Sequence, residues 1–105
     1  MSAPVADIFR RGARANLDDP RRHGSTLRID GEWRVVVAGD IHGHRANLTR
    51  VLDFADLAGS QNTILVLQEI IHGPPDPRTG QDRSFDLLLR AARLRERFGD
   101  RLVLL

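Results

Sequence analysis

The sequence predicts an α/β fold: a β-α-β-α-β run with parallel strands and flanking helices, preceded by an N-terminal helix and a β-hairpin. Short apolar runs over residues 35–38, 63–67 and 101–105 have the length of buried strands. Amphipathic segments over residues 45–57 and 84–98 lie between them and have the spacing of helices. The crossover between the first two strands is expected to be right-handed, as such crossovers almost always are.

The length and composition indicate one soluble globular domain or part of one. The chain has 105 residues, of which 41% are hydrophobic and 29% are charged. No apolar run approaches the roughly 20 residues that span a bilayer, and the N-terminus lacks the basic and apolar regions of a secretory signal. We therefore expect a cytoplasmic protein without a membrane partner.

The charge and cysteine content restrict the partners. The chain has no cysteine, so a metal ion would have to be held by carboxylate, imidazole, amide or water. All sixteen basic residues are arginine, which raises the pI to 10.8 although the formal net charge is only +2. Because acidic residues are interspersed and no aromatic platform accompanies the arginines, nucleic acid is not an expected partner.

Two elements are expected before the parallel strands. Residues 3–17 have the apolar spacing of an amphipathic helix. The pair Asp30-Gly31 separates residues 26–29 from residues 33–35, and an Asp-Gly pair between apolar runs is a strong hairpin signal. We divide the chain into residues 1–32, with the helix and the first hairpin strand, and a domain of residues 33–105.

The later elements follow from local signals. Residues 35–38 are apolar and mostly β-branched, which predicts a strand buried on both faces. Gly59 stands where the C-cap glycine of the helix over residues 45–57 is expected. The proline- and glycine-containing segment 70–82 is expected to be a loop, and Ser84 can cap the helix that follows it.

Candidate ligands follow the first two parallel strands. Asp40 comes after the first strand and Glu69 after the second, so both carboxylates share one crevice if the strands are neighbours. Asp40 and His42 are two positions apart in an extended segment, so their side chains point the same way and can hold one ion. The helix starting near Arg45 would direct its N-terminal N–H groups toward a bound phosphate.

These residues resemble a known family. Residues 39–43 read GDIHG and match the opening GDxHG motif of the calcineurin-like metallophosphoesterases, which include the phosphoprotein phosphatases. The family's second motif, GDxxDRG, follows a second strand, and residues 67–73 (LQEIIHG) resemble it. Glu69 stands for its metal-bridging aspartate, Gln68 for its glycine and His72 for its second aspartate. The resemblance covers roughly residues 34–105.

The resemblance implies half of a metallophosphoesterase β-sandwich and a two-metal site that hydrolyses a phosphoester. Asp40 and His42 would hold the first ion and Glu69 would bridge to the second, with Mn, Fe, Zn or Mg as the divalent metals. Arg83, at the start of the helix after the loop, would bind the phosphate of a phosphoprotein, a nucleotide or a small molecule. The family's GNH motif, with its proton-donating histidine, is absent, so we expect a truncated chain that is inactive alone.

Other interpretations stay open. The chain can be a degenerate, non-catalytic phosphoesterase-like module that binds a partner. Asp40, His42 and Glu69 can be ordinary turn and surface residues, and Arg83 can pair with a neighbouring aspartate on the helix. His72 can be a ligand, a partner of a ligand or an exposed loop residue, and His44 is expected to face solvent or substrate rather than metal.

Overall fold

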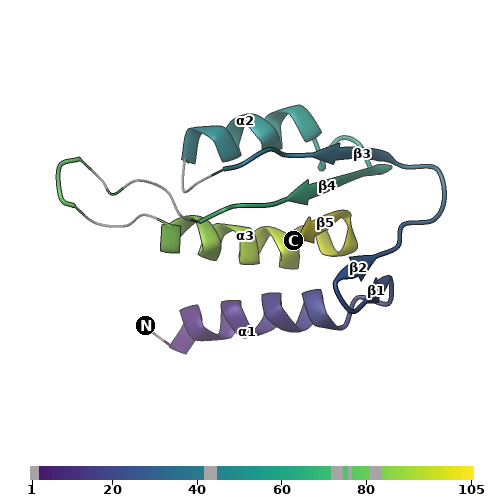
Figure 1. Cartoon of the computed structure of the whole chain (residues 1–105), viewed down its shortest axis with the longest axis horizontal. Helices are drawn as coiled ribbons and strands as arrows, with labels where there is room; N and C mark the ends of the chain where they lie inside the picture. The colour runs from purple at the N-terminus through teal and green to yellow at the C-terminus, as the bar shows by residue number, and fades with distance from the viewer. Residues whose placement is uncertain (1–2, 42–44, 72–74, 76, 81–83) are drawn as a thin grey trace.

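The computed structural model describes residues 3–41, 45–71, 75, 77–80 and 84–105. These residues form a mixed α/β fold with a three-stranded parallel sheet, a small two-stranded sheet and three α-helices (Figure 1). In chain order the elements are α1 (Ala3–Leu17), β1 (Arg22–His23), β2 (Thr26–Leu27), β3 (Arg34–Val37), α2 (Arg45–Ala55), β4 (Thr63–Leu67), α3 (Ser84–Phe98), the 3₁₀ helix η1 (Gly99–Arg101) and β5 (Leu102–Leu104). The predicted α/β class, with its alternation of parallel strands and helices, is confirmed.

The N-terminal helix α1 spans the predicted residues and packs against α3. Gly12 allows this close approach, because a Cβ atom at its position would lie only 3.1 Å from the Cβ atom of Ala92. Phe9 of α1 and Phe85 of α3 form an edge-to-face ring pair with centroids 5.6 Å apart. In the view of Figure 1, α1 lies on the far side of α3 from α2.

The β-hairpin lies earlier in the chain than predicted. β1 and β2 pair antiparallel around Gly24, whose φ of 63° is in the left-handed region that glycine adopts without strain. The predicted pairing of residues 26–29 with residues 33–35 is wrong, because Arg34–Val37 pairs in parallel with β4 instead. Gly31, with a φ of 100°, does turn the chain, but the turn leads into the parallel sheet. The Asp30-Gly31 pair therefore marks a turn, but it does not determine the strand with which β3 pairs.

β4 is the central strand of the parallel sheet, whose order is β3-β4-β5. Leu65 of β4 lies opposite Val36 of β3 and Leu102 of β5, and all five residues of β4 are buried. The expectation that residues 35–38 form a strand buried on both faces is wrong. Val35 and Val37 are 47% and 61% exposed, because β3 ends the sheet and alternate side chains point away from the helices.

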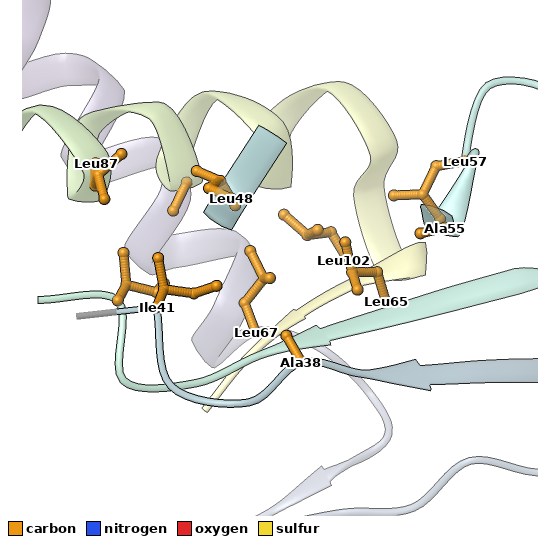
Figure 2. Close-up of a cluster of buried hydrophobic side chains, with 11 residues drawn as sticks. Ala38, Ile41, Leu48, Ala55, Leu57, Leu65, Leu67, Leu87 and Leu102 are labelled. Atoms are coloured by element: carbon orange, nitrogen blue, oxygen red, sulfur yellow. The ribbon is translucent and has the colours of Figure 1, made fainter. Parts of the chain in front are cut away.

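The main core lies between one face of the parallel sheet and the helices α2 and α3 (Figure 2). Right-handed crossovers in a sheet of order β3-β4-β5 place both helices on this face. The buried members of this core are Ala38, Ile41, Leu48, Ala55, Leu57, Leu65, Leu67, Ile70, Leu87, Ala91 and Leu102. On the other face, the segment around β2 packs against β4 and β5 through Leu27, Ile29, Ile64, Val66 and Val103.

Helix α2 ends at Ala55, two residues before the predicted end. Asp56 follows it with a φ of 49°, so Asp56 occupies the left-handed position that the sequence assigned to Gly59. At Gly59, a Cβ atom would lie 2.6 Å from a carboxylate oxygen of Asp56, so a larger residue there would require the Asp56 side chain to move. Among the described helices, none is long and apolar enough to cross a membrane.

Candidate functional site

The chain segments that follow β3 and β4 stay side by side beyond the ends of the strands. The N–H group of Ala38 donates to the carbonyl oxygen of Val66 at 2.9 Å, and the side-chain amide of Gln68 donates to the carbonyl oxygen of Ala38 at 2.9 Å. One step further, the N–H group of Ile41 donates to the carbonyl oxygen of Glu69 at 3.0 Å. The two strands are neighbours, which is the condition for a shared crevice, and this brings the backbone of Asp40 next to that of Glu69.

The position of Asp40 is determined by two buried residues on either side of it in the sequence. Ala38 and Ile41 are only 4% and 2% exposed, and both belong to the core cluster under α2 and α3 (Figure 2). Asp40 between them is exposed. The variable position of the GDxHG pattern is therefore a core position in this chain, and its burial leaves the carboxylate on the solvent side.

Glu69 has an unusual backbone conformation. Its φ of 45° lies in the left-handed region, which costs a residue with a Cβ atom about 1–2 kcal/mol. The hydrogen bond from Ile41 and the one that Gln68 makes help to hold this conformation. Backbone strain of this kind occurs preferentially at functional sites, where the surrounding structure maintains it.

Several predicted site residues lie outside the part of the chain that the structure describes. They are His42, His44, His72 and Arg83, and their roles stay predictions. Among the described residues, no group of three or more His, Cys, Asp or Glu side chains is placed to hold a metal ion. Of the predicted ligands, the structure therefore describes Asp40 and Glu69, and it places them on the same edge of the sheet.

Two features near this edge were not predicted from the sequence. One is the amide of Gln68, which joins the ends of β4 and β3. The other is a groove lined by arginines of α2 and α3, which include Arg90 and Arg93. The spacing of three between these two arginines places them on one helix face, and this spacing was the available signal.

A buried charged cluster lies away from this edge, between the chain after α1 and helix α3. Arg21 holds Asp19 through two side-chain hydrogen bonds of 2.9 and 2.7 Å. Arg95 of α3 donates to the same carboxylate at 3.2 Å, and the side chains of Asp19 and Arg95 are 3% and 4% exposed. The hydrogen bonds from Arg21 lower the pKa of Asp19 to about 2, against the raising effect of burial. This cluster joins the N-terminal segment to α3.

No protein-family model, curated protein or solved structure matches this chain.

Proposed function

We propose that this chain carries part of the site of a metal-dependent phosphoesterase. In this proposal Asp40 and His42 hold one divalent metal ion, Glu69 bridges it to a second ion, and Arg83 binds the phosphate of a phosphoester substrate. The hydrogen bond between Ile41 and Glu69 supports it most, because it keeps the two carboxylate-bearing turns together. They lie at the carboxyl ends of parallel strands, where α/β sheets bind their ligands.

The donor atoms at this edge suit hard or borderline divalent ions. Asp40 and Glu69 offer carboxylate oxygens, His42 offers an imidazole nitrogen, and the chain has no thiolate. This set fits Mn²⁺, Fe²⁺, Zn²⁺ or Mg²⁺. When bound, two such ions lower the pKa of a bridging water and stabilise the charge on the phosphoryl oxygens.

The residues of the chain would orient these groups. The buried Ile41 positions Asp40 on the solvent side, and the hydrogen bond to the Glu69 carbonyl fixes the separation of the two turns. The first N–H groups of α2, which begins at Arg45, favour an anion near the same edge. Arg83 would add a paired guanidinium contact to the phosphate.

The test is a titration of the metal-free chain with Mn²⁺ or Zn²⁺ by isothermal calorimetry. We expect one specific site, because three protein ligands at most are available for it. Asp40→Asn and Glu69→Gln should each weaken binding about tenfold or more, since even the loss of a residue that only supports a ligand costs about 10–100-fold in metal affinity. Glu32→Gln is the matched control, since Glu32 is an exposed carboxylate before the opposite end of β3. Isotherms of Asp40→Asn and Glu69→Gln that equal the wild-type isotherm would contradict the proposal.

A non-catalytic binding module is the second candidate, and the departures at Gln68, Glu69 and His72 from the family pattern favour it. The two functions differ in hydrolysis, because only the enzyme hydrolyses a phosphoester. Hydrolysis requires a positioned general acid, which raises the reaction rate by about 10²–10⁴-fold. The GNH tripeptide that supplies it in the family is absent from these 105 residues. Metal-dependent hydrolysis of an aryl phosphate after addition of a segment with that motif supports the enzyme. Metal binding without hydrolysis in the extended chain supports the module.

A further inference from the structure

A groove of about 500 Å³ lies between the start of α2 and the N-terminal half of α3. Its lining residues are Arg45, Asp86, Leu87, Leu89, Arg90 and Arg93. Both helices begin on the side of the fold where β3 and β4 end (Figure 1). Leu87 also belongs to the core cluster that contains Ile41, the neighbour of Asp40 (Figure 2). The groove therefore lies on the same side of the fold as the candidate metal site.

The arginines of this groove differ from many others in the chain because no described carboxylate pairs with them. Within the described ranges, Arg45, Arg90 and Arg93 form no ion pair. The arginines that do pair with a described carboxylate are Arg10, Arg11, Arg14, Arg21, Arg28 and Arg95. The described arginines Arg22, Arg34, Arg50, Arg97 and Arg101 also lack a carboxylate partner among the described residues, but none of them lines this groove. Here three guanidinium groups face a groove whose described lining contains one carboxylate, that of Asp86.

Two grooves lie between α2 and α3, and positive charge exceeds negative charge only in the one near Arg45. Arg90 donates to the hydroxyl oxygen of Thr49 at 3.4 Å, and that hydroxyl donates to the carbonyl oxygen of Arg45 at 3.2 Å. These contacts hold Arg90 against the first turns of α2. Arg90 also lines a second groove of about 300 Å³, where Asp53 and Asp56 balance its two arginines. An anion would therefore be attracted to the end near Arg45 and not to the other end.

We propose that the groove at Arg45, Arg90 and Arg93 binds an oligophosphate, a small anion with two or more phosphate groups. Each planar guanidinium offers paired N–H donors that match two phosphate oxygens. Three of them on two helices can contact successive phosphates, and the groove has the volume of a small-molecule site, about 300–1,000 Å³. Binding here needs no metal ion, so it is independent of the proposed hydrolysis. Combined with the proposed function, it makes phosphoesters with several phosphates the substrate class.

The test is a titration of the ¹⁵N-labelled chain with sodium triphosphate in metal-free buffer, followed by NMR and calorimetry. We expect saturable binding of one triphosphate, with the largest shifts at the amides of residues 45–49 and 86–93. Arg90→Gln and Arg93→Gln should each weaken the affinity about tenfold, through loss of a charge-assisted contact. Arg50→Gln is the matched control, because Arg50 is exposed on α2 and does not line the groove. Its affinity should stay within about twofold of the wild type.

Three outcomes overturn the proposal: no saturation, equal weakening by Arg50→Gln, or shifts centred on the arginines of α1. Each of them would show a nonspecific attraction to an arginine-rich surface. Because Arg90 contacts Thr49, Arg90→Gln can also loosen the packing of α2 on α3. Arg93 makes no such contact with the described residues, so Arg93→Gln with an unchanged melting curve separates lost binding from lost structure.

Discussion

At the scale of single residues, Glu69 combines a candidate function with a conformational cost. A glutamate at a φ of 45° has its Cβ atom close to the backbone, and a glycine there would avoid this contact. The preceding residue, Gln68, donates its side-chain amide to the carbonyl oxygen of Ala38, directly after β3. Position 69 therefore carries a charged side chain in a backbone conformation that favours glycine.

The replacement Glu69→Gly should give a more stable protein than Glu69→Ala, by about 1 kcal/mol in the free energy of unfolding. Alanine keeps the Cβ atom that the left-handed conformation disfavours, and glycine removes it. At positions with an ordinary negative φ, the alanine variant is instead the more stable one, by about 0.5–1 kcal/mol. Glu32, whose φ is not positive, provides the matched pair Glu32→Gly and Glu32→Ala. Urea unfolding measures all four variants, and alanine more stable than glycine at position 69 would contradict the observed conformation.

At the scale of elements, the cluster of Asp19, Arg21 and Arg95 joins the segment after α1 to α3. Arg95 also donates to the carbonyl oxygen of Ala15 at 3.0 Å, so α3 is tied to the last turn of α1 as well. A buried charge that loses its partner costs far more than an exposed one. The attachment of the N-terminal segment therefore depends on the ionised carboxylate of Asp19.

The stability of the chain should fall in acid because of Asp19. An aspartate has an ordinary pKa of 3.8, whereas the pKa of Asp19 is about 2 in the folded chain. Its contribution is therefore complete above the unfolded pKa and is lost as the pH falls toward the folded one. We expect a loss of about 2 kcal/mol from this group between about pH 5.5 and about pH 2. Urea unfolding at several pH values measures it, and the Asp19→Asn variant should lack this part of the pH dependence.

The same variant tests the pairing with Arg95. At pH 7, Asp19→Asn should cost about 3–5 kcal/mol because Arg95 stays buried without a charged partner. The double variant Asp19→Asn/Arg95→Met should recover part of that loss. Asp7→Asn removes a carboxylate that pairs with Arg10 at the surface, and it should change the stability by less than about 1 kcal/mol. Equal effects of Asp19→Asn and Asp7→Asn would show that the buried pair is not formed.

At the scale of the whole molecule, the two faces of the parallel sheet differ in their covering. The helices α2 and α3 cover one face, whereas the segment around β2 covers only β4 and β5 on the other. Val35 and Val37 of β3 are left exposed there, and β3 is a terminal strand of the sheet. Exposed apolar side chains on a terminal strand favour pairing with another chain. We therefore expect the 105 residues to self-associate in solution.

The double variant Val35→Thr/Val37→Thr should shift this self-association toward the monomer. Threonine keeps the branched side chain that suits a strand, so the free energy of unfolding should change by less than about 0.5 kcal/mol. Val36→Thr is the control, because Val36 is partly buried against the core under the helices, so a hydroxyl there should cost stability, up to about 1–3 kcal/mol. Sedimentation velocity over a concentration series measures the association. An unchanged association constant in the double variant would exclude this face as the contact.

The sequence by itself determined the order and type of the main elements. The limits of α1 and α3 and the central strand β4 agree with the predicted residues, since apolar periodicity and turn residues are local properties. The alternation of strands and helices indicated that the turns of Asp40 and Glu69 meet if β3 and β4 are neighbours, and the structure shows that they are. The ligand roles of these residues stay predictions.

Only the tertiary structure decided which distant segments meet. It paired Arg34–Val37 with β4 rather than with the segment before Asp30, and it left one face of β3 exposed. It brought Asp19 to Arg95, 76 positions later, and it assembled the arginine groove from two helices. Such contacts depend on the packing of whole elements, in which burial and pairing outweigh local preference. A single sequence shows the local neighbours of each residue, and it does not show which distant residue that residue will contact.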